Sequence, residues 1–258
     1  MGAILLFDSG LGGLTIYQHI RQALPNRRYR YLADNARFPY GELAPDELVQ
    51  GCVDLIRAQM AEEPIDLVVI ACNSASTLVL EPLRAAIDCP VVGVVPAIKP
   101  AAAMSHRKVI GLLATPGTVR RPYTDELAAQ FAADCELVRL GSSELVWLAE
   151  QKLAGQPVSC SQLEPILGEF LQRQPDVVVL GCTHFPLLRE EIGQVLGPQV
   201  RLIDSGAAIA RRVSQLLGGE EKEGAVFAAS FFHTGEAPAP SATVYLREQG
   251  FSNVEKWR

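Results

Sequence analysis

The chain alternates short, continuous hydrophobic runs with longer segments in which apolar residues recur every three or four positions. A short apolar run followed by helix-starting residues is typical of a buried strand in a parallel sheet, whereas the longer spacing is typical of an amphipathic helix. The alternation therefore predicts an α/β fold with mainly parallel sheets. The expected strands are residues 3–7, 29–33, the run before Cys72, 91–95, 108–113, the run before Cys182, 200–203, 225–233 and a strand-like tail at 254–257. The expected helices run from the turn after residue 8 to about 24, and over 45–61, 74–87, 123–133, 143–153, 161–172, 186–196, 207–217 and 241–249.

Two of the predicted strands share one sequence pattern. In each, a proline and an aspartate precede an apolar run, and a cysteine followed by polar residues ends it. Cys72 follows Asp66 by six positions, and Cys182 follows Asp176 by six positions. Ligands bind at the carboxyl edge of open parallel sheets. The repetition therefore predicts two pseudo-symmetric α/β domains, each presenting a thiol to an active site in the cleft between them.

The repetition also suggests how the chain divides. A length of 258 residues suits one large domain or two of ordinary size, and the internal pairing favours two. We expect a first domain of residues 1–96 and 205–258 and a second of residues 97–204. Pro96 and Pro100, with small residues near them, suit a crossing between the domains. The C-terminal segment is expected to return and complete the first domain.

Composition and charge narrow the functional classes. No window reaches the roughly 18 uncharged apolar residues that a membrane span needs. The N-terminal run has no basic region and meets Asp8 too soon for a signal peptide, so we expect a cytoplasmic protein. A formal net charge of -6 and the absence of any Lys or Arg run argue against nucleic acid or an anionic membrane as the main partner.

The six cysteines are expected to be reduced thiols, because no export signal accompanies them. No C-x-x-C or H-x-x-x-H spacing occurs, which argues against a metal site. Lys99 could suggest a pyridoxal phosphate Schiff base, but no phosphate-binding cup accompanies it, so this cofactor is not expected. Core packing is the expected role of Cys52.

Polar loops follow several predicted strands. The glycine-rich stretch 8–15 lacks the Walker lysine, and Thr15 stands where G-x-G-x-x-G requires its last glycine. A loop whose N–H groups can hold a small anion such as a carboxylate remains, and Asp8 is expected to face the cleft as a fixed charge or base. Thr115 and Thr118 follow the first strand of the second half in the same way. They are candidate carboxylate donors or caps of the next helix.

Residues 34–41 combine turn-forming residues with Phe38 and Tyr40. This combination favours an ordered loop against a ligand, with a packed loop as the alternative.

A cysteine at a strand end, just before a helix N-terminus, has its thiolate favoured by the helix dipole and by nearby N–H groups. A disulfide oxidoreductase would need adjacent sulfurs, but Cys72 and Cys182 are 182 − 72 = 110 residues apart. A single nucleophilic cysteine would make a hydrolase or amidase and leave the second unexplained. Two thiols on opposite faces of one carbon would make a two-base site that inverts configuration, and His184 could exchange a proton with Cys182. Two small buried residues without chemistry are the structural alternative.

Four segments together resemble bacterial glutamate racemases of the aspartate/glutamate racemase superfamily. They are residues 7–14 (FDSGLGGL), 33–41 (ADNARFPYG), 71–76 (ACNSAS) and 181–188 (GCTHFPLL). The resemblance covers nearly the whole chain. It implies a cofactor-independent racemase that interconverts L- and D-glutamate for peptidoglycan synthesis, with two similar α/β domains and usually as a homodimer.

The resemblance also implies residue roles. Cys72 would act on D-glutamate and Cys182 on L-glutamate, assisted by Asp8 and His184 respectively. The residues implied to line the substrate pocket are Asp8, Ser9, Tyr40, Gly41, Asn73, Ser74, Thr183 and His184.

This chain departs from the family pattern at two places. Ser74 stands where a threonine is usual, which keeps the hydroxyl. Some members carry a further pocket glutamate in the segment corresponding to residues 139–143, where this chain has none; Glu144 or Glu150 could replace it, and neither is assigned.

Two other functions stay open. One is a racemase for aspartate or another acidic amino acid, although aspartate-type relatives usually carry Glu in place of His184. The other is a glutamate-binding regulatory protein without turnover, against which the two intact cysteines argue.

Overall fold

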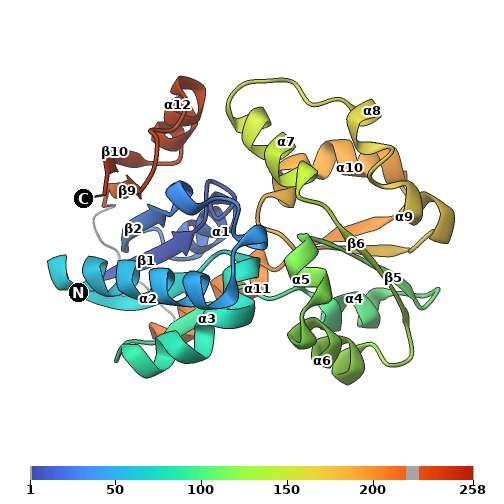
Figure 1. Cartoon of the computed structure of the whole chain (residues 1–258), viewed down its shortest axis with the longest axis horizontal. Coiled ribbons are helices and arrows are strands. Elements are labelled where there is room, and N and C mark those ends of the chain that lie inside the picture. Colours follow the sequence, from blue (N-terminus) through green and yellow to red (C-terminus); the bar gives the residue numbers. More distant parts are fainter. Residues whose placement is uncertain (1, 219–226, 258) are drawn as a thin grey trace. The chain divides into compact units, whose positions relative to one another are not determined.

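The computed structural model describes residues 2–218 and 227–257 (Figure 1). The chain forms two compact units, and each is built around its own sheet. Unit 1 comprises Met1–Val94 and Gly206–Arg258, and unit 2 comprises Val95–Ser205. The domain boundaries expected from the sequence lie between residues 96 and 97 and between residues 204 and 205.

The described strands of unit 1 form one parallel sheet in the order β10-β9-β2-β1-β3-β4. Parallel neighbours need crossover connections, and helices between the strands supply most of them. The strands are β1 (Ala3–Asp8), β2 (Arg28–Ala33), β3 (Ile65–Ile70), β4 (Val91–Gly93), β9 (Ala229–His233) and β10 (Phe251–Lys256).

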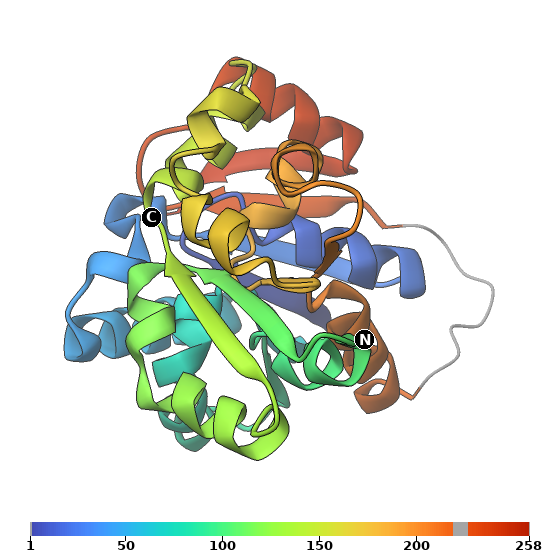
Figure 2. The same cartoon turned by 90° about the vertical axis from the view of Figure 1, so that its right-hand side faces the viewer.

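Helices cover both faces of this sheet (Figures 1 and 2). They are α1 (Leu14–Ala23), α2 (Pro45–Glu62), α3 (Asn73–Ala86), α11 (Gly206–Leu216) and α12 (Pro240–Glu248), with short 3-10 helices η1 (Asn35–Arg37) and η2 (Tyr40–Glu42). Because side chains alternate along a strand, Leu5 and Phe7 of β1 pack with α2 and α3. On the other face, the Tyr17 ring of α1 contacts Tyr29 and Phe251.

Unit 2 has a smaller parallel sheet in the order β6-β5-β7-β8. Its strands are β5 (Val109–Ala114), β6 (Glu136–Gly141), β7 (Val177–Leu180) and β8 (Arg201–Ile203). Its helices are α4 (Ile98–Met104), α5 (Pro116–Arg120), α6 (Pro122–Phe131), α7 (Glu144–Leu153), α8 (Cys160–Leu163), α9 (Gly168–Arg173), η3 (Phe185–Leu188) and α10 (Arg189–Leu196). The predicted α/β class with parallel sheets is confirmed.

The strand register brings polar residues together at one edge of each sheet. In unit 1, Asp8 is paired with Ala33 and Phe7 with Ile70, so the chain segments that follow β1, β2 and β3 leave the sheet side by side. The Asp34 N–H continues this pattern by donating to the Asp8 carbonyl at 2.8 Å.

Three local expectations are corrected by the structure. The expected helix at 161–172 is broken into α8 and α9, because Pro165 lies between them and has no N–H for a helical hydrogen bond. Of residues 96–100, which were expected in a crossing, residues 98–100 begin α4 (Ile98–Met104); Pro100 lies in its first turn, where N–H groups have no intrahelical partner. Strand β6 was not expected, because Glu136 and Arg139 interrupt its apolar residues and leave no continuous run.

The ends of other elements differ slightly from expectation. Strand β9 begins at Ala229, and residues 225–226 of the expected strand lie outside the described part of the chain. Of the helices within residues 2–218 and 227–257, none has the length and apolarity that crossing a membrane requires.

Gly181, directly after β7, tests how tightly the end of this strand is packed. A Cβ there would lie 2.8 Å from Leu112 Cδ1 and 3.2 Å from Ala114 Cβ. We expect Gly181→Ala to lower the free energy of unfolding by roughly 1–3 kcal/mol, as for other overpacked cores. Urea denaturation measures this change.

Gly193→Ala is the matched control. A Cβ at Gly193, in α10, has only Leu202 Cδ1 within 4 Å, at 3.7 Å. Alanine favours a helix over glycine by about 1 kcal/mol, so this variant should be as stable as the parent or more stable. Equal destabilisation by both substitutions would contradict the packing argument.

Candidate functional site

The first strand-end thiol lies between β3 and α3. Cys72 is the N-cap residue of α3 in an extended conformation, and it is 6% exposed. Its Sγ lies 3.8 Å from the Ser9 hydroxyl oxygen. The neighbouring Asp8 is fully buried, and its Oδ1 accepts the Gly10 N–H at 2.8 Å. The structure thus brings Asp8, Ser9 and Cys72 together at the ends of β1 and β3.

Asn73 and Ser74 begin the helix that follows the first thiol. Both side chains are buried, and Asn73 Nδ2 donates to the Val94 carbonyl at 3.2 Å. The Ser76 hydroxyl donates to the Ile70 carbonyl at 3.0 Å and accepts the Val94 N–H at 3.0 Å. These bonds fix the turn between β3 and α3, and thereby the position of Cys72.

The second thiol follows β7 in unit 2. Cys182 is 6% exposed, and its Sγ lies 3.8 Å from His184 Nδ1. His184 Nε2 lies 2.7 Å from Oε1 of Glu150, which belongs to α7. Thr183 and His184 are both buried. A thiol, an imidazole and a carboxylate therefore form a continuous chain of contacts.

The charge of His184 is set by competing effects. Burial alone would lower its pKa, but the hydrogen bonds to Cys182 and Glu150 and the negative charge of Glu150 together raise the pKa of His184 well above its ordinary value. The imidazole is therefore held as a cation near neutral pH. It can donate a proton toward Cys182 while Glu150 fixes the ring orientation.

Glu150 is one of the two glutamates that the sequence left unassigned, and it contacts His184. Glu144 lies at the exposed start of the same helix and lines a separate hollow with Arg139 and Ser142. Glu150 instead faces His184 from a position 34 residues earlier in the chain. Its place two helical turns into α7 gave no local signal, because only the packing of α7 against η3 brings the two side chains together.

Thr115 and Thr118 match the capping interpretation of the sequence. Thr115 is the N-cap of α5, and its hydroxyl accepts the Thr118 N–H at 3.4 Å. The two hydroxyl oxygens are 3.0 Å apart, and both residues are buried. Their assignment to the substrate pocket stays a prediction.

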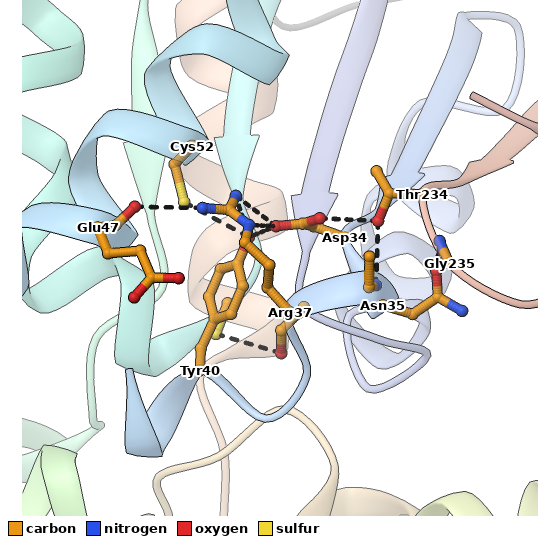
Figure 3. A network of polar contacts seen from close by, with 11 residues as sticks. Asp34, Asn35, Arg37, Tyr40, Glu47, Cys52, Thr234 and Gly235 are labelled. Atoms are coloured by element: carbon orange, nitrogen blue, oxygen red, sulfur yellow. Dashed lines mark hydrogen bonds and ion pairs between the residues drawn. The ribbon is translucent and has the colours of Figure 1, made fainter. Parts of the chain in front are cut away.

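Tyr40 and Gly41 lie in a loop held by a buried polar network (Figure 3). The Tyr40 ring points into the core of unit 1, and its hydroxyl donates to the Asp34 carboxylate. Gly41 is the second residue of η2 and is partly exposed. The Tyr40 hydroxyl is therefore bonded within unit 1, and the assignment of Tyr40 and Gly41 to the substrate pocket stays a prediction.

The other thiols have surroundings unlike those of the two strand-end cysteines. Burial raises the pKa of Cys52 to about 12, so it stays protonated, in agreement with a packing role. Cys89, Cys135 and Cys160 are free and partly exposed. No group of three His, Cys, Asp or Glu side chains suited to a metal ion occurs among the described residues.

The two units are α/β units with parallel sheets, and in each an inner strand is followed two residues later by a buried cysteine and then by a helix. The family model for Asp/Glu/Hydantoin racemase matches residues 4–213. The chain belongs to this family.

Individual relatives agree with the match. The chain is 52% identical to the glutamate racemase of Shewanella halifaxensis over 98% of this chain and 96% of that protein. It is 55% identical to the glutamate racemase of Shewanella denitrificans over 91% of this chain and 84% of that protein. The predicted resemblance to glutamate racemases is confirmed.

A solved structure gives the same picture. The Escherichia coli glutamate racemase, in complex with L-glutamate and the activator UDP-MurNAc-ala, matches with a TM-score of 0.92 and 48% identity. The match covers 98% of this chain and 97% of that chain.

The Glu150–His184 pair makes stability depend on pH. Because the pKa of His184 is raised by folding, the pair's stabilisation is fully present below the ordinary histidine value of about 6.5 and is lost as pH rises through the raised value. We expect Glu150→Gln to cost roughly 2 kcal/mol at about pH 6. The cost should shrink at alkaline pH, as measured by urea unfolding across the range.

Glu144→Gln is the control for this experiment, since it makes the same change at an exposed position of α7. It should change stability by less than about 0.5 kcal/mol at every pH. A cost for Glu150→Gln that is independent of pH would contradict the charged pair.

Proposed function

We propose that the protein is a cofactor-independent glutamate racemase in which Cys72 and Cys182 are the two acid/base groups. The observation that carries the proposal is the repeated thiol at a strand end, each with its own polar partner: Ser9 beside Cys72 and His184 beside Cys182. The L-glutamate bound by the 48% identical Escherichia coli enzyme supports the substrate assignment.

The proposed reaction moves one proton at each face of the α-carbon. One thiolate removes the α-proton, and the electron pair of the broken C–H bond is carried by the carbanion and its α-carboxylate. The other thiol then protonates the opposite face, so that the configuration inverts and the two sulfurs exchange protonation states. Cys72 acts on D-glutamate and Cys182 on L-glutamate.

The two thiols have chemically different assistants in this proposal. Asp8 and the Ser9 hydroxyl serve Cys72, whereas the His184 cation serves Cys182 and is oriented by Glu150. Asn73 and Thr183 follow the two cysteines and contribute polar groups next to each. Other contacts to glutamate are assigned to Ser74, Thr115, Thr118 and the Tyr40–Gly41 main chain.

The cellular role follows from the product. D-glutamate is a peptidoglycan building block, so the enzyme would supply cell-wall synthesis from the cytoplasm. A homodimer is proposed from the family resemblance.

Hydrogen exchange at the α-carbon tests the activity directly. In deuterated water without added cofactor, either glutamate enantiomer should give a product that carries solvent deuterium at the α-carbon. Cys72→Ser and Cys182→Ser should each lower racemisation by about a thousandfold or more, because each removes one acid/base group. Circular dichroism measures the racemisation of glutamate, and proton NMR measures the loss of the α-proton signal.

Cys160→Ser, a substitution at a thiol of α8, should retain parent activity. If the parent binds glutamate but exchanges no α-proton, the protein is a binding protein without turnover.

Aspartate is the competing substrate, since it differs by one methylene. Such a difference is worth roughly 10–200-fold in a pocket. We expect kcat/KM for L-glutamate to exceed that for L-aspartate by about tenfold or more. Parallel exchange assays on both amino acids measure the ratio, and a ratio in favour of aspartate would reassign the substrate.

A further inference from the structure

Asp34 carries the buried polar network drawn in Figure 3. It directly follows β2 and is 1% exposed. Its Oδ2 accepts the Tyr40 hydroxyl and, at 2.6 Å, Arg37 Nε. Its Oδ1 accepts the Thr234 hydroxyl at 2.7 Å. One carboxylate thus binds three side chains and joins the 34–41 loop to Thr234, and none of these contacts is a substrate contact.

The Tyr40 hydroxyl is saturated by this network. Its one hydrogen is donated to Asp34, while Arg37 Nη2 approaches its oxygen at 3.3 Å and Cys52 Sγ at 3.6 Å. Burial is the largest cause that raises the pKa of Tyr40 well above its ordinary value, so the phenol keeps this hydrogen. The hydroxyl therefore anchors the loop and is not available as a group for substrate.

The C-terminal part of unit 1 holds the same loop from the other side. Thr234 accepts the Ala36 N–H at 3.1 Å, and Asn35 Oδ1 accepts the Gly235 N–H at 2.7 Å. A Cβ at Gly235 would lie 2.9 Å from the Ala36 nitrogen, so the two backbones touch. The start of the loop is thus clamped between β2 and the end of β9.

Arg37 is seated against the backbone of α2. Its Nη1 donates to the Glu47 carbonyl at 3.1 Å. A Cβ at Gly51 would overlap the guanidinium group, so the absence of a side chain there makes room for Arg37. Because Gly51 has no Cβ, the guanidinium has the room it needs to reach Asp34 and Tyr40.

The network is continuous with the surroundings of the first thiol. The Asp34 N–H donates to the Asp8 carbonyl at 2.8 Å. The Tyr40 ring lies 6.3 Å, centroid to centroid, from the ring of Phe7, which precedes Asp8. Tyr40 and Cys72 belong to the same core cluster, and η2 contacts α3.

We propose that Asp34 and Arg37 are positioning residues for racemisation: acting through the Tyr40 hydroxyl, they fix the Tyr40–Gly41 segment relative to Asp8 and Cys72. This inference rests on the glutamate racemase activity proposed above, and it assigns the network a role in binding the substrate and not in moving protons.

Three conservative substitutions test the role: Asp34→Asn, Arg37→Lys and Tyr40→Phe. Each should raise KM for glutamate by about tenfold and change kcat by less than about threefold, as expected when a hydrogen bond to a charged group is lost from a binding element. The KM of the Asp34→Asn/Tyr40→Phe double variant should not exceed the higher of the two single-variant KM values, because both substitutions break the same network. Asp54→Asn, at an exposed carboxylate of α2, is the control and should match the parent.

Gly51→Ala separates positioning from stability. The Cβ moves the guanidinium aside, and the preference of alanine over glycine in a helix, about 1 kcal/mol, offsets part of the stability lost with the Arg37–Asp34 contact. We expect a raised KM together with unfolding at a higher urea concentration than that of Asp34→Asn. A purely structural network would give the opposite pattern: less active protein, hence lower apparent kcat, at unchanged KM in all four variants, and this result would overturn the proposal.

A measurement that does not depend on catalysis separates the test of the positioning role from the test of the racemase activity. Amide hydrogen exchange followed by mass spectrometry should be faster over residues 35–43 in Asp34→Asn and in Gly51→Ala, and unchanged over β5 in unit 2. Absence of α-proton exchange in the parent would sink the racemase proposal alone. Unchanged amide exchange over residues 35–43 in both variants would sink the positioning proposal, whatever the parent catalyses.

Discussion

The parallel pairing of strands is the constraint on which the rest of this molecule depends. When neighbouring strands run in the same direction, their carboxyl ends share one edge, and whatever follows each strand is delivered to the same place. In unit 1 this edge gathers Asp8 at the end of β1, Asp34 after β2 and Cys72 after β3. In unit 2 the same rule places Thr115 after β5 and Cys182 after β7, on paired strands. The chemistry is thus assembled by topology and not by proximity in sequence.

The two thiols are equivalent in backbone setting and different in electrostatic setting. Cys72 has a neutral hydroxyl beside it, and the nearby Asp8 carboxylate is bonded to the Gly10 N–H. Cys182 faces a histidine whose pKa is raised by its contacts with Cys182 and Glu150 despite burial. A duplicated strand–turn–helix plan therefore carries two unlike proton partners. This difference suits a reaction in which one sulfur begins as base and the other as acid, and each direction of turnover starts from a different side.

Much of this could be predicted from the sequence because the signals are local. Continuous apolar runs ending in Cys72 and Cys182 predicted the central strands, and the glycine-rich turn after Asp8 predicted the first loop; the structure has both features. Strand β6 was not predicted because it is an edge strand in which Glu136 and Arg139 interrupt the apolar residues, so that it lacks a continuous apolar run. Pro165 could have predicted the break between α8 and α9. The amphipathic pattern continues on both sides of this proline, however, and it favoured a single helix.

By itself, the sequence determined the α/β class, the family and the two thiols, since these depend on short patterns whose periodicity and residue types are visible along the chain. Only the tertiary structure decided which side chains form hydrogen bonds with Asp34 and His184. Thr234 lies 200 residues from Asp34, and Glu150 lies 34 residues from His184. A hydrogen bond depends on the positions of two groups in space, and a carboxylate has no local preference for one distant donor over another. Only the packed sheets and helices fix that choice, which is why the network around Tyr40 and the acid behind His184 emerge from the fold alone.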